Sequence, residues 1–193
     1  MRVTAMSKNQ ITEGVIWKQL LFFFFPILLG TLFQQLYNTA DTVVVGRFVG
    51  TQALAAVGGS TGQIVNLIVN FFVGLASGAT VIIARYYGAR DRIKLNNALH
   101  TAIALSIVGG IVTGIAGILL TPSLLKMMNT PADVIEGSTM YLRIYFAGII
   151  FVFVYNIGSG ILRAVGDSKR PLYFLIVCCF LNIFLDILFV VYL

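Results

Sequence analysis

Five long apolar runs constrain this chain more than any other feature of its sequence. They cover residues 16–45, 53–84, 95–120, 134–162 and 172–193. A helix that crosses a bilayer needs about 20 mostly apolar residues, and each run reaches that length. Transmembrane β-barrels instead show alternating segments of about 10 residues, a pattern that these runs lack. The sequence therefore predicts an all-α, polytopic membrane helix bundle with five transmembrane helices.

The composition supports a membrane protein and argues against a nucleic-acid partner. Hydrophobic residues make up 59% of the chain and charged residues only 10%, whereas about 25% is usual in soluble domains. The basic residues form short clusters between the apolar runs, and no basic stripe interleaves with aromatic residues along a soluble face. The predicted partner of this surface is the lipid bilayer.

The basic residues are distributed unequally between the two ends of the predicted spans. One side carries Arg2, Lys8, Lys18, Arg85, Arg90, Arg92, Lys94, Arg163, Lys169 and Arg170. The other side carries Arg47 and Lys126. Cytoplasmic loops of membrane proteins hold an excess of lysine and arginine, so we predict a cytoplasmic N-terminus.

Two aspartates lie inside apolar runs, where an ionisable side chain is costly. Asp41 shares one helix face with Gln34 and Asn38, at spacings of i, i+4 and i+7, and Asp186 lies one turn after Asn182. Both spans are predicted to run from inside to outside, so both carboxylates fall in the outer half of the bilayer. These polar residues have two possible explanations: hydrogen bonding between helices, which is structural, or an ion site, which is functional. For the two aspartates we favour the ion site.

Other residues within the runs predict packing and bending. Polar residues recur on one face of the second run at Gln63, Asn66 and Asn70, and of the fourth at Asn156, Ser159 and Arg163. Small residues at Gly74 and Gly78, and at Ser106, Gly110, Thr113, Gly114 and Gly117, predict close helix contacts. Pro26 lies inside the first run, where it removes a backbone hydrogen bond and is expected to bend the helix.

Three segments together resemble the multidrug and toxic compound extrusion (MATE) family. They are "PILLGTLFQQLYNTADTVVVGRFVG", "ARYYGARD" and "NIGSGILRAVGDSKRP". The resemblance implies a multi-pass transporter of the cell membrane, the inner membrane in prokaryotes, with twelve spans in two lobes. Residues 1–193 would then be a partial N-terminal lobe. The expected sixth helix and C-terminal lobe are absent, in keeping with the abrupt end at "VVYL".

The resemblance also implies a cation-coupling site and a direction of transport. Its residues would be Asp41, Asn182, Asp186, Tyr37 and Asn156. Family members export cationic or amphipathic small molecules in exchange for H+ or Na+, with no cofactor. Na+ would bind at Asp41, Asn182 and Asp186. Two neighbouring carboxylates in a low-dielectric medium repel each other, so the pair can retain a proton or exchange it for Na+. A kinking proline of the family is matched by Pro26, the expected hinge.

Three alternatives stay open on the sequence alone. A related flippase of lipid-linked sugars would need a strongly cationic cavity, for which only Arg143 is a candidate. The second is a non-transporting membrane fragment, a passive channel or an assembly subunit. The third is an intramembrane aspartyl protease, but Ala40 precedes Asp41 and Leu185 precedes Asp186, so the Tyr-Asp and Gly-x-Gly-Asp signatures are missing. We therefore predict that the protein is not an enzyme.

Overall fold

The computed structural model describes residues 15–191, and every regular element among them is a helix. The elements are α1 (Ile16–Val44), η1 (Val45–Val49), α2 (Thr51–Gly58), α3 (Ser60–Gly88), α4 (Arg92–Met127), α5 (Ile135–Ala164) and α6 (Lys169–Val191). Five helical segments are long and apolar enough to span a membrane: Trp17–Val49, Thr51–Gly88, Arg92–Met127, Ile135–Ala164 and Lys169–Val190. The predicted all-α membrane bundle is confirmed.

The second predicted span differs from the structure, because it is two helices. The run expected at 53–84 begins as α2, breaks at Gly59 and continues as α3. Gly59 has a φ of −68° and a ψ of −123°, outside the helical region. Before this break, Gly50 turns the chain from η1 into α2 with a φ of +108°, in the left-handed region that favours glycine.

The third predicted span, 95–120, is longer in the structure at both ends. Asp91 caps the start of α4, where its side chain accepts a hydrogen bond of 3.0 Å from the Lys94 N–H. This backbone hydrogen bond holds the pKa of Asp91 below its usual value. At the other end α4 continues through Pro122 to Met127. Helical structure therefore extends past the apolar run on both sides.

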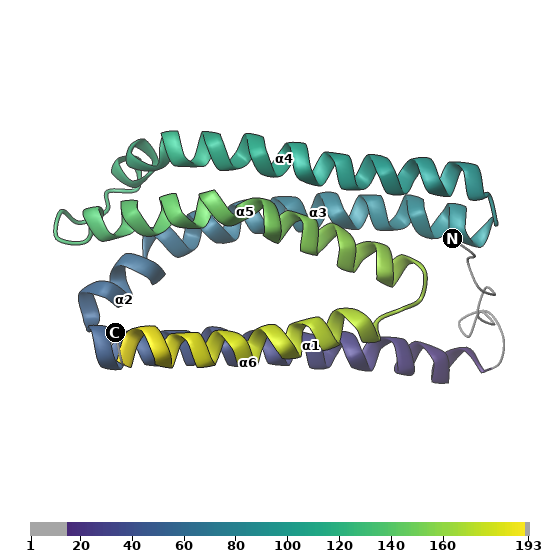
Figure 1. The fold of residues 1–193 in the computed structure, drawn as a ribbon, viewed down its shortest axis with the longest axis horizontal. Helices are drawn as coiled ribbons and strands as arrows, with labels where there is room; N and C mark the ends of the chain where they lie inside the picture. Colours follow the sequence, from purple (N-terminus) through teal and green to yellow (C-terminus); the bar gives the residue numbers. More distant parts are fainter. Residues whose placement is uncertain (1–14, 192–193) are drawn as a thin grey trace.

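The helices pack in two groups (Figure 1). In the first, α3, α4 and α5 each contact the other two; in the second, α1 lies along α6. The η1–α2 segment joins the groups at one end, and the short turn between α5 and α6 joins them at the other. The hydroxyl of Ser138 in α5 donates a hydrogen bond of 3.0 Å to the carbonyl of Ala56, which fixes α2 against α5.

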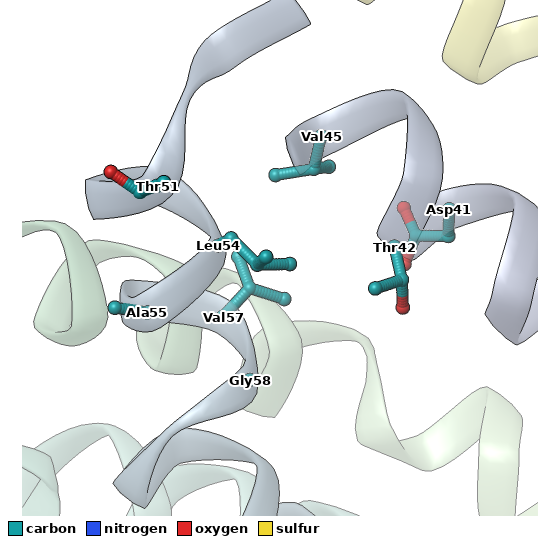
Figure 2. Close-up of a pocket in the computed structure, with 8 residues that line it drawn as sticks. All are labelled: Asp41, Thr42, Val45, Thr51, Leu54, Ala55, Val57 and Gly58. Atoms are coloured by element: carbon teal, nitrogen blue, oxygen red, sulfur yellow. The ribbon is translucent and has the colours of Figure 1, made fainter. Parts of the chain in front are cut away.

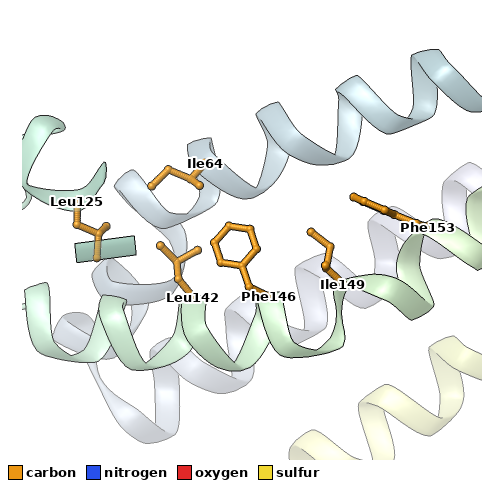
Figure 3. Close-up of a cluster of buried hydrophobic side chains, with 6 residues drawn as sticks. All are labelled: Ile64, Leu125, Leu142, Phe146, Ile149 and Phe153. Atoms are coloured by element: carbon orange, nitrogen blue, oxygen red, sulfur yellow. The ribbon is translucent and has the colours of Figure 1, made fainter. Parts of the chain in front are cut away.

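The main cluster of buried apolar side chains lies within the three-helix group (Figure 3). Its fully enclosed side chains include Leu142, Phe146, Ile149 and Phe153, which follow one face of α5 at helical spacing. Ile64 of α3 and Leu125 of α4 complete the cluster. In contrast, most large apolar side chains of α1 and α6 are exposed. The pair α1–α6 therefore gains little stabilisation from burial inside this chain.

Glycines of α4 allow it to approach α5 closely. A Cβ atom added at Gly110 would lie 2.8 Å from the Cα of Ile150, and one at Gly114 would lie 2.9 Å from the carbonyl oxygen of Phe146. A Cβ atom at Gly117 would overlap the Phe146 ring. The prediction that small residues of this span form a helix contact is confirmed.

The same prediction for the second span is wrong within this chain. Nothing lies within 4 Å of a Cβ atom built at Gly74 or Gly78. The spacing of two small residues shows that a helix could be approached closely on that face, but it does not specify a neighbour. In the described chain, the close contacts of α3 are made by other residues, such as Phe72, which stacks on Phe153.

We expect the α4–α5 contact to be sensitive to a single added methyl group. Gly114→Ala should destabilise the chain by about 1–3 kcal/mol, the usual cost of overpacking a well-packed core, because the new Cβ would meet the backbone of α5. Gly74→Ala is the matched control and should leave stability unchanged or slightly raised. Thermal unfolding of the purified variants in detergent measures the difference. Equal melting temperatures for the two variants would contradict the packing described here.

The predicted orientation can be measured by cysteine labelling. In a background with Cys178→Ala and Cys179→Ala, we introduce Ala89→Cys, Lys169→Cys or Ala132→Cys, all at exposed positions. The excess of basic residues predicts that impermeant maleimides label the cysteines at 89 and 169 only from the cytoplasm, and the one at 132 only from outside. Labelling with the opposite sidedness would reverse the topology.

Candidate functional site

Asp41 lies in the last turn of α1 and borders a pocket of about 390 Å3 (Figure 2). We call it the η1 pocket; it is lined by Asp41, Thr42, Val45, Thr51, Leu54, Ala55, Val57 and Gly58. Asp41 is half-buried and is the only ionisable group of this lining. The pocket therefore presents one carboxylate beside mainly apolar walls.

The backbone changes its helical winding at Val45, one turn after Asp41. The N–H of Gly50 donates to the carbonyl of Val45 at 3.1 Å, five residues back, as in a π-helix. Such wide turns are rare and occur frequently at functional sites. The hydroxyl of Thr42 donates to the carbonyl of Asn38 at 2.8 Å, and so supports the last turn of α1 from within.

Two oxygen atoms on α6 lack hydrogen-bond partners although they are buried. They are Oδ1 of Asn182 and Oδ2 of Asp186, which lie one helical turn apart. A buried polar atom without a partner is costly and calls for an explanation such as an ion. An amide oxygen and a carboxylate oxygen on one helix face are suitable ligands for Na+ or for a proton held on the carboxylate.

The structure brings Asp41 and Asp186 into the same neighbourhood. Helix α1 packs along α6, and the two carboxylates lie close enough for their charges to interact. The described residues contain no group of three or more His, Cys, Asp and Glu side chains that could hold a metal ion.

The other three predicted site residues occupy different positions. Tyr37 is half-buried, one turn before Asp41, and lies near Tyr141 and Tyr145 of α5. Asn156 lies in a second pocket, where Pro26 is also part of the lining, and its amide donates to the carbonyl of Val152 at 2.8 Å. The structure thus places Asn156 and Pro26 together and apart from the η1 pocket.

Sequence reasoning missed Tyr141 and Tyr145. Both are half-buried, and their stacked ring centroids lie 6.4 Å apart on consecutive turns of α5. Tyr141 also lies within electrostatic range of Asp41. The i, i+4 spacing of two tyrosines within an apolar run was the available signal, since a phenol in a membrane helix requires a polar environment for its hydroxyl.

The polar stripe of the second span does not bond helices together within this chain. Gln63, Asn66 and Asn70 are all exposed on α3. The stripe on α1 is similar, because Gln34 and Asn38 are exposed and only Asp41 of that face is half-buried. Exposed polar stripes on spanning helices indicate a face that is not lipid-facing, such as one lining a water-filled cavity.

Comparison with known proteins agrees with this architecture. Residues 26–188 match the MatE family model. The chain is 35% identical over 185 residues to the probable multidrug resistance protein YpnP of Bacillus subtilis (strain 168). The aligned region covers 96% of the chain and 41% of YpnP. It is 34% identical over 168 residues to the probable multidrug resistance protein YoeA of the same organism, covering 87% of the chain and 36% of YoeA.

A solved structure has the same fold. It is the outward-facing conformation of a multidrug resistance MATE family transporter of the MOP superfamily, with a TM-score of 0.88 and 30% identity over 98% of this chain and 42% of that one. The chain therefore spans roughly two-fifths of the length of the relatives that it matches. The family model, the relatives and the fold agree, and the chain belongs to the MATE family of multidrug transporters.

Proposed function

We propose that this chain is the ion-coupling part of a secondary antiporter. The complete transporter would export cationic or amphipathic compounds in exchange for H+ or Na+. The observation that carries the proposal is the pair of carboxylates, Asp41 and Asp186, within electrostatic range of each other on the adjacent helices α1 and α6. MATE proteins are transporters and not enzymes, and the names of YpnP and YoeA point to multidrug resistance.

The coupling step follows from the chemistry of this pair. With both carboxylates ionised, their mutual repulsion in a low-dielectric environment favours the uptake of a proton or cation. The unpartnered oxygens of Asn182 and Asp186 supply ligands on α6, and Asp41 neutralises the ion from α1. Occupancy of the site therefore changes how strongly α1 is attracted to α6. A difference of this kind between two conformations is what allows an ion gradient to drive transport.

The surroundings of α1 permit such a change. Pro26 lies inside the helix, where it removes one backbone hydrogen bond and weakens resistance to bending. The π-helical turn after Asp41 gives a second point at which the winding can alter. The proposed hinge at Pro26 precedes Asp41 along the chain, and η1 follows it. Movement at either point would shift the Asp41 carboxylate relative to α6.

The same geometry does not favour the alternatives. Arg143, the candidate cation of a flippase cavity, is exposed on α5. The two aspartates lie beside unpartnered ligand oxygens on α6 and not beside the signatures of an aspartyl protease. The remaining alternative is a membrane fragment without an ion site, and the ion-binding experiment discriminates against it.

Ion binding tests the site in the chain as it stands. We expect Na+ titrated into the purified chain, in a choline buffer, to bind with an affinity that falls about tenfold or more in Asp41→Asn and in Asp186→Asn. Each change removes a charged ligand, whose contribution is about 1.5–3 kcal/mol. Asn182→Ala removes a neutral ligand and should weaken binding only severalfold. Isothermal titration calorimetry measures these affinities.

Asp133→Asn is the matched control, because Asp133 is exposed and lies outside the site; it should bind like the wild type. If the site takes only protons, the wild type will show no Na+ signal. Infrared difference spectra between acidic and alkaline pH will then contain carboxyl bands that disappear in Asp41→Asn or Asp186→Asn. The proposed site would be refuted if these variants changed neither the ion affinity nor the carboxyl bands.

We expect no drug export from the chain alone. The basis is its length, since it covers 41% of YpnP, and the exposure of the polar stripe on α3. When the chain is expressed in a bacterium that lacks its main efflux pumps, ethidium accumulation should equal that of the empty vector. A complete relative such as YpnP, expressed in the same way, is the positive control. Ion-dependent efflux by the 193-residue chain would show that these helices suffice.

A further inference from the structure

Arg163 is unusual among the cations of this chain, because it is half-buried. Every other lysine and arginine in the described part of the chain is exposed. Arg163 also has no carboxylate partner among residues 15–191, since the ion pairs found there join Asp91 to Lys94 at 3.3 Å and Asp167 to Arg170 at 3.1 Å. A partly desolvated charge without a counter-ion is unfavourable. It therefore favours an anion from outside the chain.

Arg163 lines a partly open pocket between α1, α5 and α6, which we call the α5–α6 pocket. The pocket has a volume of about 110 Å3. Its lining consists of Pro26, Ile27, Gly30, Thr31, Gln34, Tyr155, Asn156, Ser159, Arg163, Ser168, Pro171, Leu172 and Leu175. Arg163 is the only charged residue in this set. Ser159 and Ser168, from the two sides of the α5–α6 turn, are only 5% exposed.

The chemistry of the lining suits a phosphate group. The arginine side chain presents a planar fork of donors that matches phosphate oxygens, and such contacts are among the strongest hydrogen bonds in proteins. The serine hydroxyls, and the amides of Gln34 and Asn156, are further donors. Drug-sized ligands need pockets of about 300–1,000 Å3. The α5–α6 pocket is smaller, and fits a compact anionic group.

The depth of the pocket also suits a phosphate group. Arg163 is the residue before the end of α5 at Ala164, and Ser168 directly precedes α6. Because both helices are long enough to span a membrane, this end of the two spans is expected at the boundary between hydrocarbon and headgroups, where the phosphates of lipids are found. Basic pockets between spanning helices bind anionic headgroups in other membrane proteins.

We propose that the α5–α6 pocket binds a phosphate group through Arg163. The phosphate can belong to the headgroup of a lipid such as phosphatidic acid, or it can be free phosphate from solution. The site is separate from the proposed ion site and does not depend on it, because neither Asp41 nor Asp186 lines the pocket. A bound phosphate would connect α5 with α6 at the turn that joins the two helix groups.

Arginine near the end of a helix also has a purely structural role, since it interacts favourably with the last carbonyls. This role predicts that Arg163 affects stability but binds no ligand. The two explanations therefore differ in ligand binding, and binding must be the measured quantity.

The test uses native mass spectrometry of the 193-residue chain in dodecyl maltoside. We titrate dioctanoyl phosphatidic acid, and separately dioctanoyl glycerol, which has the same chains without the phosphate. We expect phosphatidic acid to bind and dioctanoyl glycerol to bind at least tenfold more weakly. Arg163→Gln should weaken the binding of phosphatidic acid by about tenfold or more, because it removes the charge while keeping a polar side chain of similar length.

Arg85→Gln is the matched control, since Arg85 is an exposed arginine of the last turn of α3 and is predicted to lie on the same side of the bilayer. It should leave the affinity unchanged. Addition of inorganic phosphate distinguishes the two sources: displacement of the lipid at millimolar concentration identifies a site for free phosphate, and failure to displace it identifies a lipid site. Both results support a phosphate site.

A second measurement on the unmodified chain covers the case in which Arg163→Gln does not fold. Phenylglyoxal modifies accessible arginines, and peptide mapping gives the rate at each position. Phosphatidic acid should slow modification of Arg163 and not of Arg85. Any of three results would overturn the proposal. They are equal binding of phosphatidic acid and dioctanoyl glycerol, an equal loss of affinity in Arg163→Gln and Arg85→Gln, and no protection of Arg163 from phenylglyoxal.

Discussion

The close contact between α4 and α5 is the interaction on which the arrangement of this chain depends. In a bilayer there is no hydrophobic force between helices, so packing must supply the attraction. Gly110, Gly114 and Gly117 remove side chains from one face of α4, and the backbone and aromatic ring of α5 occupy that space. Helix α3 packs onto the same α5 face through Ile64 and Phe72. The result is a rigid three-helix scaffold.

The packing between α1 and α6 differs from that of the three-helix scaffold. The pair buries few apolar side chains, yet it carries both aspartates and the two unpartnered oxygens of α6. Its connection to the scaffold consists of η1 with α2, broken at Gly59, and the turn before Ser168. Weakly packed elements are those that move in functional transitions. The chain thus combines a well-packed three-helix scaffold with a less extensively buried helix pair, which carries both aspartates.

Much of the helical arrangement could be predicted from the sequence, and the predictions that failed have identifiable causes. Length and apolarity determine where spanning helices lie, because a backbone in hydrocarbon must satisfy its own hydrogen bonds. Helical spacing correctly put Asp186 and Asn182 on one face. It did not detect the break at Gly59, because the run is apolar over its whole length, although the Gly58-Gly59-Ser60 sequence is typical of a break. Nor could it place Asn156, because spacing gives the face of a helix but not the neighbour that the face meets. The tyrosines at 141 and 145 were missed for the same reason.

The adjacency of α1 and α6 has a consequence for biogenesis. The two helices that share the acidic pair are the first and last spanning elements of the described chain. During synthesis, α1 and its Asp41 enter the membrane long before α6 exists, whereas the scaffold forms from helices that are close in sequence. Contacts between distant segments form late because a long loop must be closed first. In the nascent chain, Asp41 therefore enters the membrane before the Asn182 and Asp186 oxygens of α6, which would share its proton or cation, have been made.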